Sequence, residues 1–294
     1  MADGAYIPKP ASPAWRRWGR AFIHWFDTGP HVVPKDGEPL PDIPDRVEWA
    51  RILPFVGMHL ACFAVIWVGW SPVAVGVAVS AYLVRMFAIT GFYHRYFSHR
   101  SFKTSRVGQF IFGVLGASAV QRGPVWWAAH HRHHHAYSDK PEDVHSPVQR
   151  GFILSHMGWF LTARGFRPDL RRVRDLLQFP ELRWLDRFDI LVPVALAVGM
   201  FGLGALLARV APELGTSAGQ MLVWGFFVST VACYHGTYTI NSLSREPPLT
   251  VRQVGRSSTF RKPWRSKKST KKRAGNSSMP RPVADQMARP MGRM

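Results

Sequence analysis

Four long apolar stretches dominate the hydrophobic pattern of the chain. Each is about as long as the α-helix that is needed to cross the hydrocarbon core of a bilayer. Arg85 interrupts the second stretch, and we expect it to face the interior of a helix bundle or to reach toward the headgroups. One residue separates the first two stretches, which should form a tight hairpin. The predicted membrane spans are residues 52–70, 72–92, 190–207 and 220–240.

The segments outside these spans are less apolar. Residues 107–120 are interrupted by glycine and are too short to cross a bilayer, which predicts an amphipathic helix along the membrane face or beneath a metal site. Residues 1–48 form a polar, proline-rich N-terminal arm. Aromatic and basic residues at 13–27 predict a short interfacial helix within it, and a disordered leader is the alternative. His59, in the first span, is interpreted as a packed or hydrogen-bonded histidine.

Positive charge is distributed unevenly around the predicted spans. Residues 93–187 contain 15 Lys and Arg, whereas the loops at the other ends of the spans contain one. Because cytoplasmic loops are enriched in these residues, we expect 93–187 and both termini to be cytoplasmic. The formal net charge is +20, and residues 245–294 hold 14 Lys and Arg against Glu246 and Asp285. The apolar stretches favour a lipid bilayer over nucleic acid as the partner of this charge.

Candidate chemistry is concentrated in a histidine-rich stretch at residues 126–139. On a helix, His131, His134 and His135 fall at positions i, i+3 and i+4 and share one face, whereas the other two histidines of the stretch point elsewhere. Imidazole suits iron, copper, nickel and zinc. The spacing therefore predicts a metal site. A solvated basic run is the alternative, which is disfavoured because the stretch lies between an apolar helix and an acidic turn.

A second histidine pair, His94 and His99, follows the second span. Residues five apart do not share a face of a regular helix, so the pair converges only if each histidine binds a different ion or the helix ends between them.

Cys62 and Cys233 are the two cysteines, which argues against an iron–sulfur cluster and excludes a disulfide framework. Five imidazoles from two segments indicate two metal ions. Iron is favoured because a site beside a lipid-facing cavity suits O₂ chemistry on an apolar chain.

Three motifs resemble those of one known family. HRYFSH at 94–99, HRHHH at 131–135 and NSLS at 241–244 are similar to motifs of the membrane fatty acyl desaturases, closest to the bacterial stearoyl-CoA type Δ9 acyl-CoA desaturases. The resemblance runs from about residue 45 to Ser244. It implies an all-α integral membrane protein of the bacterial inner membrane, with four transmembrane helices and a cytosolic helical histidine-rich cap. Residues 49–244 would form the membrane desaturase domain.

The resemblance also implies a cofactor and its ligands. The family uses two non-haem iron ions and O₂, and inserts a cis double bond with two electrons from a redox partner such as ferredoxin or rubredoxin with its reductase. The histidines of both motifs are expected to bind iron here, namely His94, His99, His131, His134 and His135. Asn241 is expected to meet an iron through a bound water.

Five further residues are expected at the substrate, a fatty acyl-CoA or an acyl lipid. Gln121, Thr237 and Tyr238 would line the bend of the acyl tunnel. Trp159 and Arg164 would lie near the thioester and the CoA head. Ordinary helix packing or a surface charge is the alternative for each.

The resemblance breaks after Ser244. The family continues with a histidine, where this chain has Arg245, and then with a third histidine motif, whereas residues 245–294 contain no histidine. Their basic, proline- and serine-rich composition predicts a disordered tail. Three interpretations stay open: a frameshift after Ser244, a genuine basic tail that binds anionic lipid or nucleic acid, and a complete enzyme with substitute ligands. Nucleic acid is disfavoured because binding would need more aromatic residues for stacking than residues 245–294 contain, which are Phe260 and Trp264.

The functional expectation is an O₂-dependent acyl desaturase, of Δ9 type, that is impaired in this chain because iron ligands are missing. A related di-iron lipid hydroxylase or alkane oxygenase, and a catalytically dead membrane remnant of a desaturase, are the alternatives. The residues present leave one side of an iron pair open. We therefore expect weak iron binding and poor turnover.

Overall fold

Helices make up the regular structure of the part of the chain that the computed structural model describes, residues 14–38, 43, 46–138, 140, 143 and 146–243. Within these residues there is no β-strand, and an isolated antiparallel bridge joins Val47 to Thr162. The all-helical prediction is confirmed for this part. The predicted basic tail at 245–294 lies outside the described residues.

Three helices in the described part are long and apolar enough to cross a membrane, Trp49–Val68, Pro72–Ser98 and Leu191–Val210. They coincide with three of the four predicted spans. The second is longer than predicted because the helix continues past His94 and ends at Ser98. Their elements are α2 (Trp49–Ala61), η1 (Cys62–Ala64), α3 (Val65–Val68), α4 (Pro72–Phe87), η2 (Ala88–Ser98) and α10 (Leu191–Val210).

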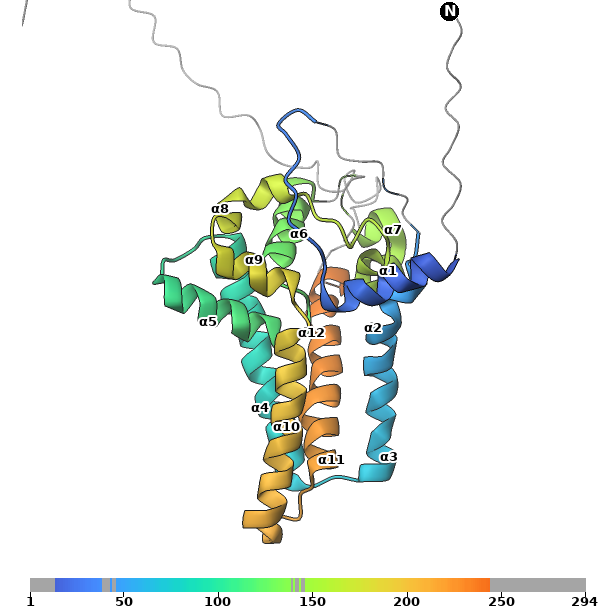
Figure 1. Ribbon diagram of the computed structural model, residues 1–294, viewed down its shortest axis with the longest axis vertical. Coiled ribbons are helices and arrows are strands. Elements are labelled where there is room, and N and C mark those ends of the chain that lie inside the picture. The colour runs from blue at the N-terminus through green and yellow to red at the C-terminus, as the bar shows by residue number, and fades with distance from the viewer. Residues whose placement is uncertain are drawn as a thin grey trace, which may run out of the picture. The chain divides into compact units, whose positions relative to one another are not determined.

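The fourth predicted span, 220–240, is helical but is not one of these three. The short helix η6 (Pro212–Leu214) precedes it, and its own elements are α11 (Ala218–Gln220), η7 (Met221–Val228) and α12 (Ser229–Leu243). This helix packs against its neighbours, because η7 contacts both α4 and α10 and α12 contacts α4 (Figure 1).

The predicted hairpin between the first two spans is present. The first helix ends at Val68, and Gly69 follows with φ of +66°, a conformation that favours glycine. Ser71 then caps α4, since its hydroxyl accepts a hydrogen bond from the Ala74 amide at 3.1 Å. The chain therefore reverses within three residues.

Arg85 of α4 lies in the interior of the helix bundle with 2% of its surface exposed. Its guanidinium donates to the Thr230 hydroxyl at 2.5 Å, to the Gly225 carbonyl at 3.4 Å and to the Ser229 hydroxyl. Of the two positions expected for this side chain, the interior one is confirmed. The contacts join α4 to the helix η7–α12. His59 is hydrogen-bonded, as predicted, with Nδ1 2.8 Å from the Phe55 carbonyl.

The segment between the second and third spans folds into a set of helices that we call the cap. The expected helix at 107–120 is α5, and the expected N-terminal helix at 13–27 is α1 (Ala14–Phe26). In Figure 1, α1 and the helices α6–α9 lie at the same end of the long helices. The cap consists of α5 (Arg106–Ala117), α6 (Pro124–Ala136), α7 (Pro147–Ile153), η3 (Leu154–Gly158), η4 (Trp159–Leu161), η5 (Leu170–Val173), α8 (Arg174–Leu177) and α9 (Pro180–Arg187).

Tyr93 connects the second span to the cap. Its side chain is fully buried, and its hydroxyl donates to the Arg122 carbonyl at 3.2 Å. Gly116 of α5 lies directly against the ring, so a Cβ atom there would come within 1.9 Å of Tyr93 Cε1. The absence of a side chain at Gly116 therefore allows α5 to approach the residue that precedes His94.

This contact generates a stability prediction. We expect Gly116→Ala to lower the free energy of unfolding by about 2 kcal/mol, because the buried Tyr93 ring must move to accept the methyl group. The measurement is thermal unfolding of the detergent-solubilised protein. Gly199→Ala on α10 is the matched control, since no atom lies within 4 Å of the added Cβ there. Equal unfolding temperatures for the two variants would contradict the prediction.

Candidate metal centre

His94 and His99 converge because η2 is a π-helix. In a π-helix the backbone bonds join residues five apart, and here the His99 amide donates to the His94 carbonyl at 3.1 Å. The wider turn places residues i and i+5 on one face, and the two Nε2 atoms are 3.2 Å apart. The helix also ends at Ser98, between the two histidines, which is one of the two conditions expected for convergence. The π-helical turn is a further condition that the spacing alone did not indicate.

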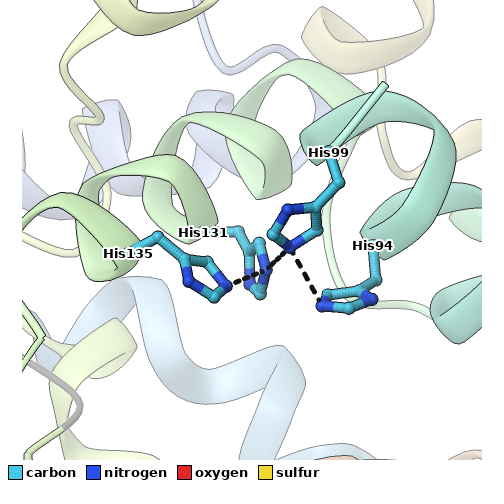
Figure 2. Close-up of side chains that lie close together, drawn as sticks. All are labelled: His94, His99, His131 and His135. Carbon is cyan, nitrogen blue, oxygen red and sulfur yellow. Dashed lines mark hydrogen bonds between the residues drawn. The ribbon is translucent and has the colours of Figure 1, made fainter. Parts of the chain in front are cut away.

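His131 and His135 of α6 complete a cluster of four imidazoles, shown in Figure 2. They are one α-helical turn apart, with Nε2 atoms 2.9 Å from each other, and His131 Nε2 lies 3.1 Å from His99 Nε2. One nitrogen from each of the four side chains falls within 4.8 Å of all the others. Two separate helices thus direct these four imidazoles to one point. All four are among the five residues that the sequence predicted as iron ligands.

The spacing of these nitrogens fits a metal site. Ligand nitrogens about 2.1 Å from one ion lie about 3.0–3.4 Å apart, which is close to the three observed separations of 2.9–3.2 Å. Burial, together with the neighbouring histidines, lowers the pKa of His131 to about 2. This imidazole is therefore neutral at ordinary pH and keeps a lone pair for a metal ion.

His134, the fifth predicted ligand, lies beside the cluster rather than among its four members. Its Nδ1 is 2.9 Å from the carboxylate of Asp143, whose side chain is fully buried. A carboxylate that holds one nitrogen of a histidine fixes the tautomer and aims the other nitrogen, as is typical around metal ligands. The sequence interpretation missed Asp143, although its place in the acidic turn after the histidine-rich stretch was a signal.

Contacts of two charged side chains, Asp186 and Arg132, hold α6 in place. Asp186 of α9 accepts a hydrogen bond from the Trp126 amide at 2.8 Å and thereby caps the helix from outside. Further along, Arg132 pairs with the Asp175 carboxylate at 2.7 Å and donates to the Ser98 carbonyl at 3.1 Å. Because Ser98 ends η2, Arg132 braces the two histidine-bearing helices against each other. Its role was not predicted, since nothing in its spacing distinguishes it from a solvated arginine.

The remaining histidines of the stretch point away from the cluster, as predicted. The His130 ring packs against both Trp126 and Trp159, with ring centres 4.5 and 5.1 Å away. The His133 ring lies against Tyr137 at 4.8 Å. Both make aromatic contacts within the cap.

A cavity of about 510 Å³ lies next to the cluster. His94, His131 and His134 line it. Its other walls are mostly apolar and come from α2, α10, η7 and the cap, including Ile52, Phe55, Met58, Val194, Ala197 and Phe226. Histidine side chains of the site therefore open onto a space that an apolar chain could fill.

Four of the five residues expected at the substrate line this cavity. The Gln121 amide donates to the Thr237 hydroxyl at 2.9 Å, which joins the cap to α12. Tyr238 is 8% exposed, and Trp159 stacks on Trp126. Arg164 is exposed and is not part of the lining. Asn241 belongs to α12, but its side chain lies outside the described residues.

Comparison with known proteins addresses the predicted resemblance. The family model for fatty acid desaturases matches residues 68–265, two thirds of the chain. The chain belongs to the fatty acid desaturase family. The predicted resemblance is thus confirmed. The matched region begins and ends later than the 45–244 expected from the motifs, and it contains all four histidines of the cluster.

Several desaturases of known activity are similar to this family member. The sn-1 stearoyl-lipid 9-desaturase of Anabaena variabilis is 32% identical over 68% of this chain and 70% of its own length. The palmitoyl-monogalactosyldiacylglycerol delta-7 desaturase of Arabidopsis thaliana is 34% identical over 67% of this chain and 50% of its own. The acyl-CoA 5-desaturase AL21 of Anemone leveillei is 30% identical, over 71% and 65%. The chain therefore spans half to seven tenths of these relatives.

The cluster generates a prediction about metal binding. We expect His131→Ala to lower the affinity for Fe(II) or Co(II) at least 100-fold, because His131 lies within 3.1 Å of two other cluster nitrogens. Titration with Co(II), monitored by its optical absorption, measures the affinity of each protein. His133→Ala on the same helix is the matched control and should bind metal as the unaltered protein does. Equal losses in the two variants would argue against the cluster.

A second prediction concerns the buried carboxylate. We expect Asp143→Asn to lower metal affinity about tenfold, because the amide no longer holds His134 in one tautomer. The same titration measures the effect. Asp175→Asn is a comparison at a carboxylate that contacts Arg132 instead of a histidine. Unchanged affinity in Asp143→Asn would show that this carboxylate does not support a ligand.

Proposed function

We propose that this chain carries an O₂-dependent fatty acyl desaturase site that forms a cis double bond, at the Δ9 position, through a non-haem di-iron centre. The observation that carries the proposal is the opening of the histidine cluster onto an apolar cavity. The substrate is a saturated acyl chain of an acyl-CoA or an acyl lipid. Relatives named for stearoyl lipid, palmitoyl galactolipid and acyl-CoA support this class.

His94, His99, His131, His134 and His135 would hold the iron, with Asn241 acting through a water. When bound, the iron would let O₂ accept two hydrogen atoms from adjacent methylenes and two electrons with two protons from a donor, forming two water molecules. The protein's own contribution is positional. Asp143 orients His134, and burial keeps His131 neutral. His131 would therefore be ready to bind without losing a proton.

The cavity walls would hold the acyl chain and exclude water. Ile89 and Phe226 supply apolar surface to the cavity, and a dry site protects a strong oxidant from side reactions. Gln121 and Thr237 satisfy each other's polar groups at 2.9 Å, so they can border an apolar chain at little cost. Together with Tyr238 they would shape the bend of the tunnel, and Trp159 would lie near the acyl head.

We place the protein in a bacterial inner membrane with four transmembrane helices and a cytosolic cap. The helix Ala218–Leu243 is the fourth span in this proposal, supported by its packing against α4 and α10. The arginine-rich segment 164–187 would offer a basic cytosolic surface to an acidic electron donor, a ferredoxin or rubredoxin with its reductase. Arg164, exposed there, would lie near the substrate head or this surface.

We propose three segments, the arm 1–48, the membrane desaturase domain 49–244 and a basic tail 245–294. The residues named above leave part of an iron pair unligated, so iron should be held weakly and turnover should be poor in this chain. A frameshift after Ser244 is the proposed origin of the tail, because residues 245–294 contain no histidine and hold 14 Lys and Arg against Glu246 and Asp285. Sequencing of the gene across codons 235–260 tests it, and a histidine-containing alternative frame is the expected result.

Product analysis tests the activity. We expect the 294-residue chain to form few or no monounsaturated acyl chains in a bacterial host. A chimera that carries the corresponding C-terminal segment of the Anabaena variabilis relative in place of residues 245–294 should form them. Mass spectrometry of extracted acyl chains measures the products and the bond position, and His131→Ala within the chimera is the inactive control.

The outcomes separate the candidate functions. Hydroxylated chains from the chimera would favour a lipid hydroxylase. Two tightly held irons and full activity in the 294-residue chain would overturn the proposed impairment. A chimera that binds two irons and leaves all acyl chains saturated would contradict desaturation. The remaining interpretation would be a catalytically dead membrane remnant of a desaturase.

A further inference from the structure

One end of the cavity is charged. Two arginines, Arg51 at the start of α2 and Arg122 before α6, line the cavity together with Phe166 and Asp189. Arg51 Cζ lies 3.8 Å from the centre of the Phe166 ring, and Arg122 Cζ lies 5.6 Å from the same centre. A guanidinium group packs well against an aromatic ring and keeps its N–H donors at the edge. A single ring thus holds two cations at one point of the wall.

The carboxylates nearby do not neutralise both arginines. Asp189 pairs with Arg122, with Oδ2 3.1 Å from Nε. Arg51 makes no side-chain hydrogen bond or ion pair within the described residues, although it is half-buried. Its electrostatic neighbours are Arg122, Arg167, Glu48 and Asp189, so three cations face two carboxylates. A partly buried cation without an anionic partner is costly. This end of the cavity is therefore suited to one more negative charge.

The backbone fixes Arg122 in place. Its φ is +70°, and its carbonyl accepts the hydrogen bond from the buried Tyr93 hydroxyl. The guanidinium also lies 5.5 Å from the Trp126 ring. The Arg122 side chain is therefore preorganised by its backbone and by the two aromatic rings, so it loses little conformational entropy when it binds a ligand.

We propose that Arg51 and Arg122 bind an anionic group, a carboxylate or a phosphate, at the head of the lipid whose acyl chain occupies the cavity. The ligand is an amphiphile with a negative charge within a few bonds of its acyl carbon, either a free fatty acid or a phosphate-bearing glycerolipid. This rests on the proposed function in that the apolar part of the same cavity takes the acyl chain. Arg51 supplies the uncompensated charge, and Asp189 limits the contribution of Arg122.

Equilibrium binding of radiolabelled lipids to the purified full chain, in a non-ionic detergent, tests the proposal. Two lipid pairs share the same acyl chain and differ in the anionic group: palmitate with methyl palmitate, and 1-palmitoyl-lysophosphatidate with 1-monopalmitoylglycerol. The variants are Arg51→Gln and Asp189→Asn. Arg209→Gln is the matched control, because Arg209 is an exposed arginine near the far end of α10. Each comparison uses the same lipid with variant and unaltered protein, so partition into micelles cancels.

We expect Arg51→Gln to weaken binding of at least one anionic lipid about tenfold and to leave its neutral partner within about twofold. Asp189→Asn should act in the opposite direction and strengthen anion binding severalfold, whereas Arg209→Gln should change nothing. A loss confined to palmitate identifies a free carboxylate as the ligand, and a loss confined to lysophosphatidate identifies a phosphate headgroup.

Equal weakening of charged and neutral lipids by Arg51→Gln would show a structural role and overturn the proposal, as would no weakening at all. The assay needs neither iron nor turnover. Anion selectivity in a chain whose chimera forms no double bond would therefore contradict the proposed function alone. Desaturation by a chimera without anion selectivity would contradict this inference alone.

Discussion

The site depends on the distance between two helices, η2 and α6. Four imidazoles meet within 4.8 Å only if both helices keep their relative position and their own pitch. The π-helical turn of η2 aligns residues five apart, while the α-helical turn of α6 aligns residues four apart. Arg132 joins the end of one helix to the middle of the other. Without this contact between Arg132 and Ser98 the two helices could separate, and the cluster would be lost even with every histidine present.

The same arrangement gives the cluster its surroundings. Its buried side opens onto an apolar cavity, where a low dielectric keeps His131 neutral and would keep water from a bound chain. Charged groups in the lining, Arg51, Arg122 and Asp189, are held around Phe166 and Trp126. Histidine, apolar and cationic surfaces therefore meet in one space, which fits the amphiphilic substrate that we propose.

The long helices differ in how they support this space. The helix Trp49–Val68 has 6% of its most apolar window buried, whereas Pro72–Ser98 has 28%. The first therefore presents most of its apolar surface outward, which suits contact with lipid. The second carries the buried Arg85 and leads directly into His94 and His99. Structural constraint and candidate chemistry thus lie on the same helix.

Much of this protein follows from local sequence patterns. Uncharged runs of about 20 residues predict long helices, the spacing of His131 and His135 predicts a shared helical face, and the motifs predict the family. These features depend on residues close together in the chain, where helix geometry alone relates side chains.

The tertiary structure decided what depends on distant residues. His94 and His99 converge on a π-helix that ends between them, at Ser98, and residue spacing did not indicate this helix type. Asp143 and Arg132 gained their roles from partners on other elements, and the pairing of Arg51 with Arg122 joins positions 71 residues apart around one ring. Periodicity cannot predict such contacts, because it describes a single element and says nothing of which faces meet.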